Sequence, residues 1–183
     1  MTAMNKINVI RIIVGHLDTL RDSSTGKRSW VDLAFFFGLP LLAALIGWFY
    51  GWGLYVDTLN ALIAAFAIFS VLLLNLLILI FAFSPGAAHP NALAKTRTGF
   101  VRELHDNIAF SVLISILIVI AALVGVAQLK MKDPQNAVHT GPVLTFIVIY
   151  LTAHFVLTLL MILKRIHILL GTDIEQPSIR RAS

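Results

Sequence analysis

The sequence predicts an all-α, polytopic membrane protein of four transmembrane helices, with an N-terminal amphipathic helix before them and helical extensions on the cytoplasmic side. Hydrophobic residues make up 58% of the 183 residues and charged residues only 13%, whereas soluble domains average about 45 to 50% and about 25%. The apolar residues are gathered into four nearly uncharged runs of about 20 residues or more, the length that crosses a bilayer. Such runs exclude a soluble enzyme, a disordered chain and a β-barrel, whose strands alternate in hydropathy.

The N-terminal segment, residues 1–29, is predicted to be cytoplasmic and to contain an amphipathic helix over residues 5–21. Apolar residues recur there at helical spacing and share one side of the helix. Such a helix can lie on the inner leaflet, dock on a partner protein or pack beneath its own bundle. The apolar side consists of Ile7, Ile10, Ile13, Val14, Leu17 and Leu20, and the polar side of Asn8, Arg11, Gly15, Asp18 and Asp22.

Residues 30–171 form the predicted membrane domain. Helical patterns extend two of its spans on the cytoplasmic side, from about Thr98 into the third span and from the fourth span to Gly171, a typical helix C-cap. The polar tail, residues 172–183, is predicted to be flexible. At a rise of 1.5 Å per residue, each span reaches at least ~31 Å, which matches a hydrocarbon thickness of ~30 Å. The spans cover residues 30–50, 58–83, 107–129 and 143–163.

Basic residues set the predicted orientation. Twelve of the fourteen Lys and Arg residues lie before the first span, between the second and third, or after the fourth. By the positive-inside rule, both termini and the middle loop are therefore cytoplasmic. The compact topology is typical of a bacterial inner-membrane protein, so the lipid bilayer is a predicted partner, and direct nucleic-acid binding is not expected. Candidate contacts for lipid headgroups or a cytosolic protein are Arg11, Arg21, Lys27, Arg28, Lys95, Arg97, Arg102, Lys164 and Arg165.

His154 is predicted to lie near the middle of the fourth span, where an ionisable group is costly and marks a candidate functional site. Tyr150 and Thr158 lie one turn away on either side, so the three residues form a polar stripe along the helix. The stripe can line a pore or a proton path. It can equally hydrogen-bond a neighbouring helix or a backbone carbonyl.

Further polar residues and one proline interrupt the other spans. The amide of Asn75 needs a hydrogen-bond partner in the bilayer, which a second subunit or a pore can supply. Ser111 and Ser115 share a face of the third span and predict close contact between helices. Pro40 lacks an N–H and frees a backbone carbonyl one turn earlier, which makes it a candidate hinge or the site of a fixed kink.

Catalytic and cofactor motifs are absent from the sequence. No nucleophile elbow, H-E-x-x-H zinc motif or Walker loop is present. The chain has no cysteine, which excludes disulfides, thiol redox chemistry and iron–sulfur clusters. A membrane haem site would need paired histidines at depth, and only His154 is predicted there. We therefore expect no catalytic residue, no metal and no cofactor.

One resemblance is carried by Gly15-His16-Leu17-Asp18-Thr19-Leu20-Arg21, by Ser24-Thr25-Gly26-Lys27 and by Trp30-Val31-Asp32 leading into Leu39-Pro40. These segments resemble the opening of small four-span bacterial inner-membrane proteins of anti-phage defence modules, such as the Kiwa membrane subunits (KwaA). The resemblance implies a homo-oligomeric protein that senses membrane disturbance or permeates the membrane and works with a cytosolic partner.

The expected function is therefore that of a non-enzymatic, oligomeric membrane sensor or effector of an anti-phage defence system. The missing catalytic motifs, the cytoplasmic helical segments and the sparse polar residues at depth all favour this class. The alternative is an ion channel or small transporter with a polar seam through Asn75 and His154.

Overall fold

The computed structural model of the protein describes residues 9–20, 30–82, 92–131 and 139–180. Every regular element within these residues is an α-helix, which confirms the predicted all-α class. The helices are α1 (Val9–Asp18), α2 (Trp30–Phe49), α3 (Val56–Ala82), α4 (Ala92–Met131) and α5 (Pro142–Arg180).

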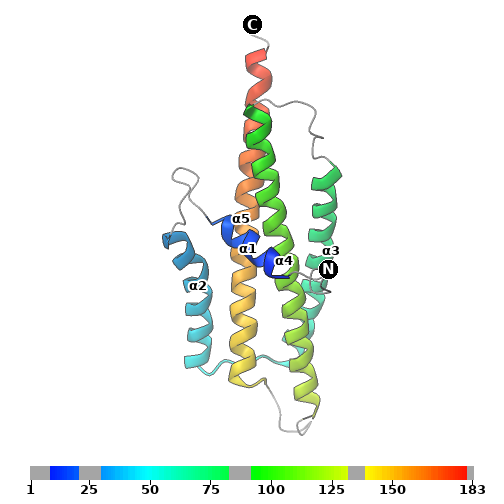
Figure 1. Ribbon diagram of the computed structural model, residues 1–183. Helices are drawn as coiled ribbons and strands as arrows, with labels where there is room; N and C mark the ends of the chain where they lie inside the picture. The colour runs from blue at the N-terminus through cyan, green and yellow to red at the C-terminus, as the bar shows by residue number, and fades with distance from the viewer. Residues whose placement is uncertain (1–8, 21–29, 83–91, 132–138, 181–183) are drawn as a thin grey trace, which may run out of the picture.

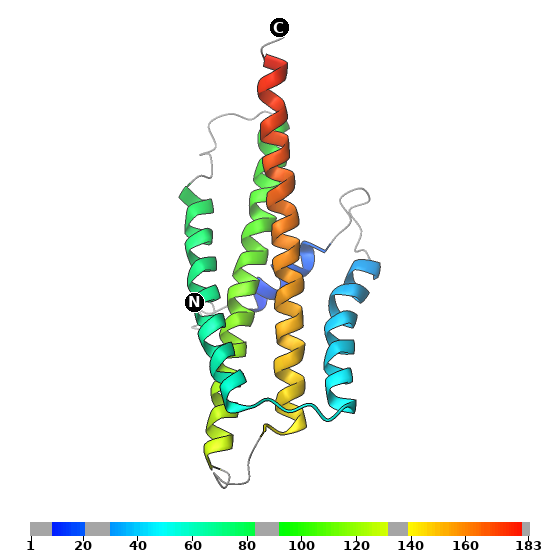
Figure 2. The ribbon, with the colours of Figure 1, turned by 180° about the vertical axis from the view of Figure 1, so that it is seen from behind.

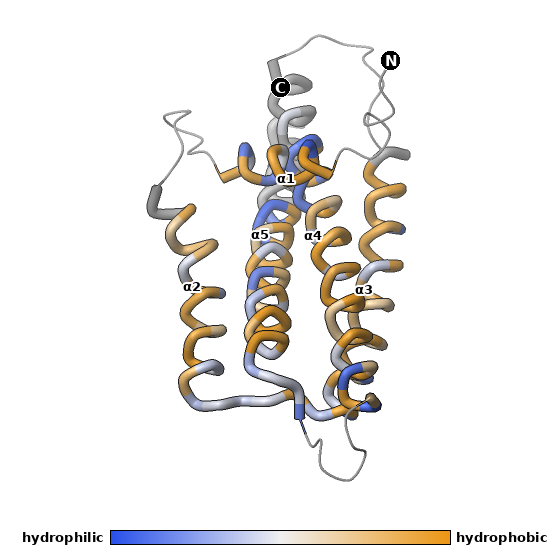
Figure 3. The backbone as a smooth tube through the Cα atoms, turned by 60° about the horizontal axis from the view of Figure 1, so that its bottom comes forward, coloured by the Kyte–Doolittle hydropathy of each residue, from blue (hydrophilic) through white to orange (hydrophobic). Residues whose placement is uncertain are grey.

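Three of the helices are long and apolar enough to cross a membrane, which agrees with a membrane protein. The apolar stretches are Val56–Ile80 in α3, Val101–Met131 in α4 and Pro142–His167 in α5. Helix α2 contributes a shorter apolar stretch, Leu33–Phe49. Figure 3 shows the hydrophobic colour along most of these helices, with hydrophilic residues concentrated where α4 and α5 pass α1.

The long helices stand side by side in the order α2, α5, α4, α3, and each runs antiparallel to its neighbours (Figures 1 and 2). Backbone contacts join α2 to α5, α5 to α4 and α4 to α3. Helices α4 and α5 continue past the other two at the end where the C-terminus lies. The helices therefore form a row in which α2 and α3 occupy the two outer places.

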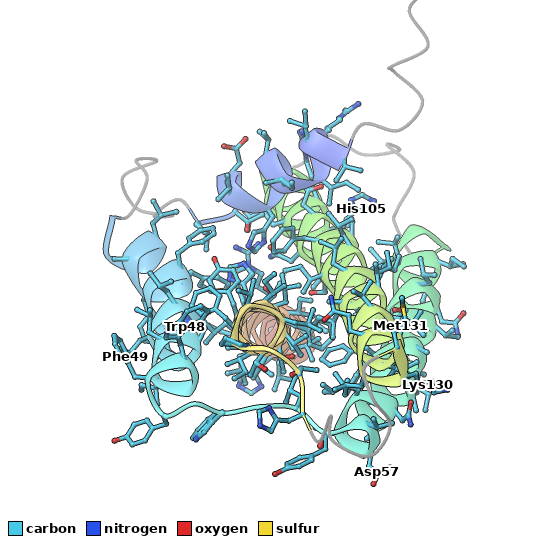
Figure 4. The ribbon with its side chains drawn as sticks, turned by 90° about the horizontal axis from the view of Figure 1, so that it is seen from below. Trp48, Phe49, Asp57, His105, Lys130 and Met131 are labelled. Atoms are coloured by element: carbon cyan, nitrogen blue, oxygen red, sulfur yellow. The ribbon has the colours of Figure 1, made fainter. Side chains whose placement is uncertain are left out.

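Helix α1 does not continue the row but lies across one face of it (Figures 1 and 4). Its backbone packs on α4. Gly15 permits this close approach, because a Cβ atom on it would lie only 3.1 Å from the carboxylate carbon of Asp106. The helix ends at Asp18, before the predicted end at residue 21, and residues 5–8 and 21 lie outside the described residues.

The predicted helix end at Gly171 was wrong, whereas the predicted flexibility of the tail stays a prediction. Helix α5 runs through Gly171 to Arg180, so Gly171 is not a C-cap and residues 172–180 are helical. A glycine inside a helix costs only about 1 kcal/mol relative to alanine, which a long helix with a packed first half tolerates. Helix α4 likewise begins earlier than predicted, at Ala92 rather than near Thr98.

The apolar core lies where α3, α4 and α5 meet. Phe155 of α5 contacts two rings of α3, with centroids 4.9 Å from Phe66 and 5.5 Å from Phe69. The hydroxyls of Ser70 and Ser115 lie 2.7 Å apart and join α3 to α4. This serine pair is the close helix contact expected of Ser115, and it lies away from α1.

The far end of the row is closed by a short backbone pairing. The Thr140 amide donates to the Leu54 carbonyl at 3.0 Å, and the Leu54 amide donates to the Thr140 hydroxyl oxygen at 3.0 Å. The connection from α2 to α3 is thereby tied to the residues that precede α5. Gly51 lies in this connection with a φ of 65°, a conformation that glycine adopts without steric cost.

Candidate functional site

Polar side chains from three helices meet beneath α1, and we call this group the α1 junction: His16, Thr19, Asn107, His154, Thr158 and Arg165. All except Arg165 are buried. His16 Nδ1 and Asn107 Oδ1 lie 2.8 Å apart, and the Thr19 hydroxyl lies 2.9 Å from the same amide oxygen. Thr19 also donates to the His16 carbonyl at 2.6 Å. Asn107 is therefore the residue through which α4 holds His16 of α1 and Thr19 of the turn that follows α1.

His16 is enclosed by rings as well as by the amide. Its side chain is 1% exposed and stacks on Phe110 of α4, with ring centroids 3.8 Å apart and an interplanar angle of 7°. Burial lowers the pKa of His16 from 6.5 to about 4, against a raising effect of the Asn107 hydrogen bond. The ring is thus neutral at pH 7, which suits a histidine packed between aromatic side chains.

Arg165 anchors the C-terminal end of α1. One guanidinium nitrogen donates to Glu103 of α4 at 2.7 Å, and another donates to the Thr19 carbonyl at 2.8 Å. That carbonyl belongs to the turn that ends α1, where a cation satisfies backbone oxygens and interacts well with the helix dipole. Arg165, predicted as a lipid or partner contact, here links α5, α4 and α1.

His154 of α5 joins α2 to the junction. Its Nδ1 lies 3.2 Å from the Phe36 carbonyl oxygen, which can only accept, so Nδ1 carries the proton. Pro40 has no N–H and cannot satisfy this carbonyl within α2, because Phe36 lies four residues earlier. The carbonyl that Pro40 was predicted to free thus finds its donor on another helix. This geometry is the contact with a neighbouring backbone that was one of the two interpretations of His154.

The predicted polar stripe on α5 is present, and aromatic rings surround its centre. Thr158 donates to the His154 carbonyl at 2.9 Å. The Tyr150 ring is nearly parallel to that of His154, with centroids 6.0 Å apart. The His16 ring lies 6.1 Å from His154 in an edge-on arrangement. Three phenylalanines complete the enclosure, at 5.1 to 5.7 Å from His154: Phe36, Phe37 and Phe110.

Two polar atoms of the junction are buried without a hydrogen-bond partner in the described part of the chain. They are His16 Nε2 and Asn107 Nδ2, and the Ser111 hydroxyl, one turn along α4 from Asn107, is buried in the same state. Each such group destabilises the docked arrangement by about 1 to 3 kcal/mol relative to a hydrated one. The free energy that the specific contacts of α1 contribute to docking is therefore partly offset by these unpartnered groups.

The remaining predicted residues lie apart from the junction or are not described. Asn75 is exposed on α3, at the outer end of the row, and so lies away from His154. Arg11, Arg102 and Lys164 are exposed. Lys95 and Arg97 lie in α4, but their side chains fall outside the described residues, as do Arg21, Lys27 and Arg28 entirely.

Three junction residues were absent from the predicted set: His16, Thr19 and Asn107. His16 and Thr19 lie in the segment that carries the defence-protein resemblance, and Asn107 lies one turn before Ser111 on the same face of α4. These signals marked the residues as unusual. They did not pair them, because His16 and Asn107 are 91 residues apart in the chain.

Neither a protein-family model, a curated protein nor a solved structure matches the chain. Among the described residues, no three His, Asp or Glu side chains gather in a way that could hold a metal ion. The chemistry of the site is therefore argued from its own geometry.

The link between Pro40 and His154 predicts a non-additive pair of substitutions. His154→Phe keeps an aromatic ring but leaves the Phe36 carbonyl without a donor, so we expect it to lower the unfolding free energy by about 0.6 to 2 kcal/mol. In a Pro40→Ala background the residue-40 amide can satisfy that carbonyl, and His154→Phe should then cost much less. Unfolding titrations in mixed micelles measure this double-mutant cycle, and an equal cost in both backgrounds would contradict the link.

Proposed function

We propose that the protein is a non-enzymatic, homo-oligomeric membrane sensor whose moving element is α1. In this proposal α2 also crosses the bilayer, which gives four spans in a bacterial inner membrane with both termini in the cytoplasm. Trp30 to Phe49 spans 20 residues, or ~30 Å of helix. The distribution of basic residues sets the orientation.

The orientation of α1 carries the proposal. Its buried side chains include the polar His16, whereas three aliphatic residues of its opposite side are exposed: Ile10 (71%), Ile13 (39%) and Val14 (46%). A surface helix of a soluble protein normally places such side chains against the core. An outward side that combines these aliphatic residues with the exposed charges of Arg11 and Asp18 is instead suited to the boundary between headgroups and acyl chains.

The depth of the junction supports the same interpretation. Asn107 lies six residues inside the apolar stretch of α4 that begins at Val101, or ~9 Å along the helix. Helix α1 packs at this level, so its outer face meets the edge of the hydrocarbon region. The side of α1 that carries His16 binds the bundle, and Ile10, Ile13 and Val14 on the exposed side meet lipid. A disturbance of lipid packing therefore changes the balance between docked and released α1.

The projecting ends of α4 and α5 offer a route to a cytosolic partner. Both helices continue past α2 and α3 on the side where α1 lies nearest (Figure 1). Arg165 connects α1 to α5 at the base of this projection. We propose that release of α1 breaks this contact and alters how the projection binds a soluble protein. The resemblance of residues 15–40 to membrane proteins of anti-phage modules makes phage infection the proposed disturbance.

Site-directed labelling tests the sensing step. In vesicles, Leu20→Cys places a thiol at a position that is buried in the docked state, and Ile10→Cys places one at an exposed position. Adding lysophospholipid should raise the maleimide labelling rate of the cysteine at position 20 several-fold while leaving that at position 10 nearly unchanged. A labelling rate at position 20 that does not respond to the lipid would refute sensing by α1.

The defence role has a separate test. Cells that carry the gene together with its two flanking genes should lower the plating efficiency of phage, and an Asn107→Leu variant present at the same level should not. Equal plating with and without the gene would contradict the defence role. It would not bear on the lipid response of α1, which the labelling experiment tests.

A further inference from the structure

The outer face of α3 exposes an amide to the bilayer. Asn75 is exposed and lies five residues inside the apolar stretch that ends at Ile80, which is ~8 Å along the helix. Lipid tails supply no hydrogen-bond partner, so an amide there is costly until another polar group faces it. Within the chain, α3 packs on α4 through its other side.

Asn75 belongs to a regular stripe on that outer face. Successive exposed residues recur at intervals of three and four, which is the spacing of a helix–helix seam. The stripe lies about 180° around the helix from the residues of α3 that are buried in the core, such as Phe66 and Leu73. Alanines at one end allow a second helix to approach closely. The stripe consists of Ala61, Ala64, Ile68, Val71, Asn75 and Ile78.

We propose that this stripe is a subunit interface and that its occupant is α3 of a second copy of the chain, with the two Asn75 amides hydrogen-bonded to each other. A carboxamide is both a donor and an acceptor, so an identical amide satisfies it across a two-fold axis. A second copy inserted with the same topology brings its Asn75 to the same depth, whereas another membrane protein would have to match both depth and chemistry.

This interface specifies which helices meet in the proposed homo-oligomer. It rests on the proposed placement of α3 across the bilayer. It does not depend on sensing by α1. Because α3 occupies an outer place in the row (Figure 4), two copies can meet along it without disturbing the α1 junction. The interface and the lipid response of α1 can therefore fail separately.

Cysteine cross-linking in native membranes tests the interface, and the natural chain contains no cysteine to interfere. Single cysteines at positions 68, 71, 75 and 78 should form disulfide-linked dimers on mild oxidation. Matched controls are Leu42→Cys, exposed on α2, and Leu73→Cys, buried against α4. Dimers that form equally well at position 42, or that are absent along the whole stripe, would overturn the proposal.

A substitution series tests the amide pair itself. Asn75→Leu should weaken self-association in detergent by about 3- to 30-fold, the equivalent of one interhelical hydrogen bond. Asn75→Gln should restore most of it. The control is Leu74→Ala, at an exposed position of α3 about a quarter turn around the helix from the stripe, which should leave association unchanged. Association that is insensitive to Asn75→Leu, or equally sensitive to Leu74→Ala, would contradict the amide pair.

Discussion

Replacing Asn107 with leucine is expected to release α1 from the bundle. The substitution removes the acceptor 2.8 Å from His16 Nδ1 and leaves a buried ring nitrogen without a partner. The Thr19 hydroxyl still has the His16 carbonyl as an acceptor, so the loss is mainly that of the histidine contact. An unsatisfied buried group costs about 1 to 3 kcal/mol, which lowers the ratio of docked to released α1 by about 5- to 150-fold.

Spin labels at two exposed positions measure this ratio directly. Labels on Ile13→Cys and Lys164→Cys should give one narrow distance distribution in the parent chain and a broad, longer one after Asn107→Leu. Ser111→Ala is the matched control, one turn along the same face of α4. It removes a buried hydroxyl that lacks a partner in the described residues, so docking should be unchanged or tighter. A narrow distribution that persists in the Asn107→Leu variant would show that Asn107 does not hold α1.

Acidification is expected to weaken the docking of α1 through His16. The pKa of His16 is lowered from 6.5 to about 4, chiefly by burial. A depressed histidine pKa means that the released state binds the proton more tightly, so docking is strongest above pH 6.5 and is lost as the pH falls towards 4. From pH 7 to pH 5 the loss is on the order of 2 kcal/mol, or roughly a 20-fold change in the docked ratio.

The charged and titratable groups that face His16 define the controls for this pH dependence. They come from α4, as Asp106, and from α5, as His154 and Arg165. The same pair of spin labels, followed from pH 7 to pH 5, should show the released distance growing. His16→Gln keeps an N–H donor for Asn107 but does not titrate, so it should remove most of the change. An unchanged pH dependence in that variant would place the titrating group elsewhere.

The helices were predictable because composition and length determine them. Trp30 to Phe49 and Val56 to Ala82 agree with the predicted spans to within about two residues at each end, since long apolar runs have no other stable state in a bilayer. The ends of α4 and α5 were not predictable to that degree. Gly171 is typical of a C-cap, but its small helix penalty does not stop a helix that is already formed.

The α1 junction was only half predictable. The sequence singled out His154, Thr158 and Arg165, and Pro40 as a residue that frees a carbonyl. His16, Thr19 and Asn107 were not among the predicted site residues. The partners were not visible, because they are set by the order of the helices in the row. His154 meets Phe36 across 118 residues, and Arg165 meets Glu103 across 62. Local spacing rules do not reach such distances.

The orientation of α1 differs from the one that its helical wheel favours, because contacts with residues far away in the chain set it. The wheel groups Ile10, Ile13 and Val14 with Leu20 on one apolar side, and in the folded chain the first three are exposed while Leu20 is buried. Hydrogen bonds from Thr19 and His16 to Asn107 of α4 and the close approach at Gly15 set this orientation. A sequence pattern shows which residues share a face of a helix. It does not show which face points outwards, because lipid can cover an apolar face of a membrane protein.

A disulfide between α1 and α4 tests most directly whether α1 docks in this way. A Cβ atom at Gly15 lies 3.1 Å from the Asp106 carboxylate carbon, near the ~3 Å between a Cβ atom and the far sulfur of a disulfide. In membranes at pH 7, the double variant Gly15→Cys and Asp106→Cys should cross-link within the chain rapidly and nearly completely. Pairing Asp106→Cys with Ile13→Cys, on the exposed side of α1, should give little product. Equal rates for the two pairs, or no cross-link at position 15, would contradict the docked orientation of α1.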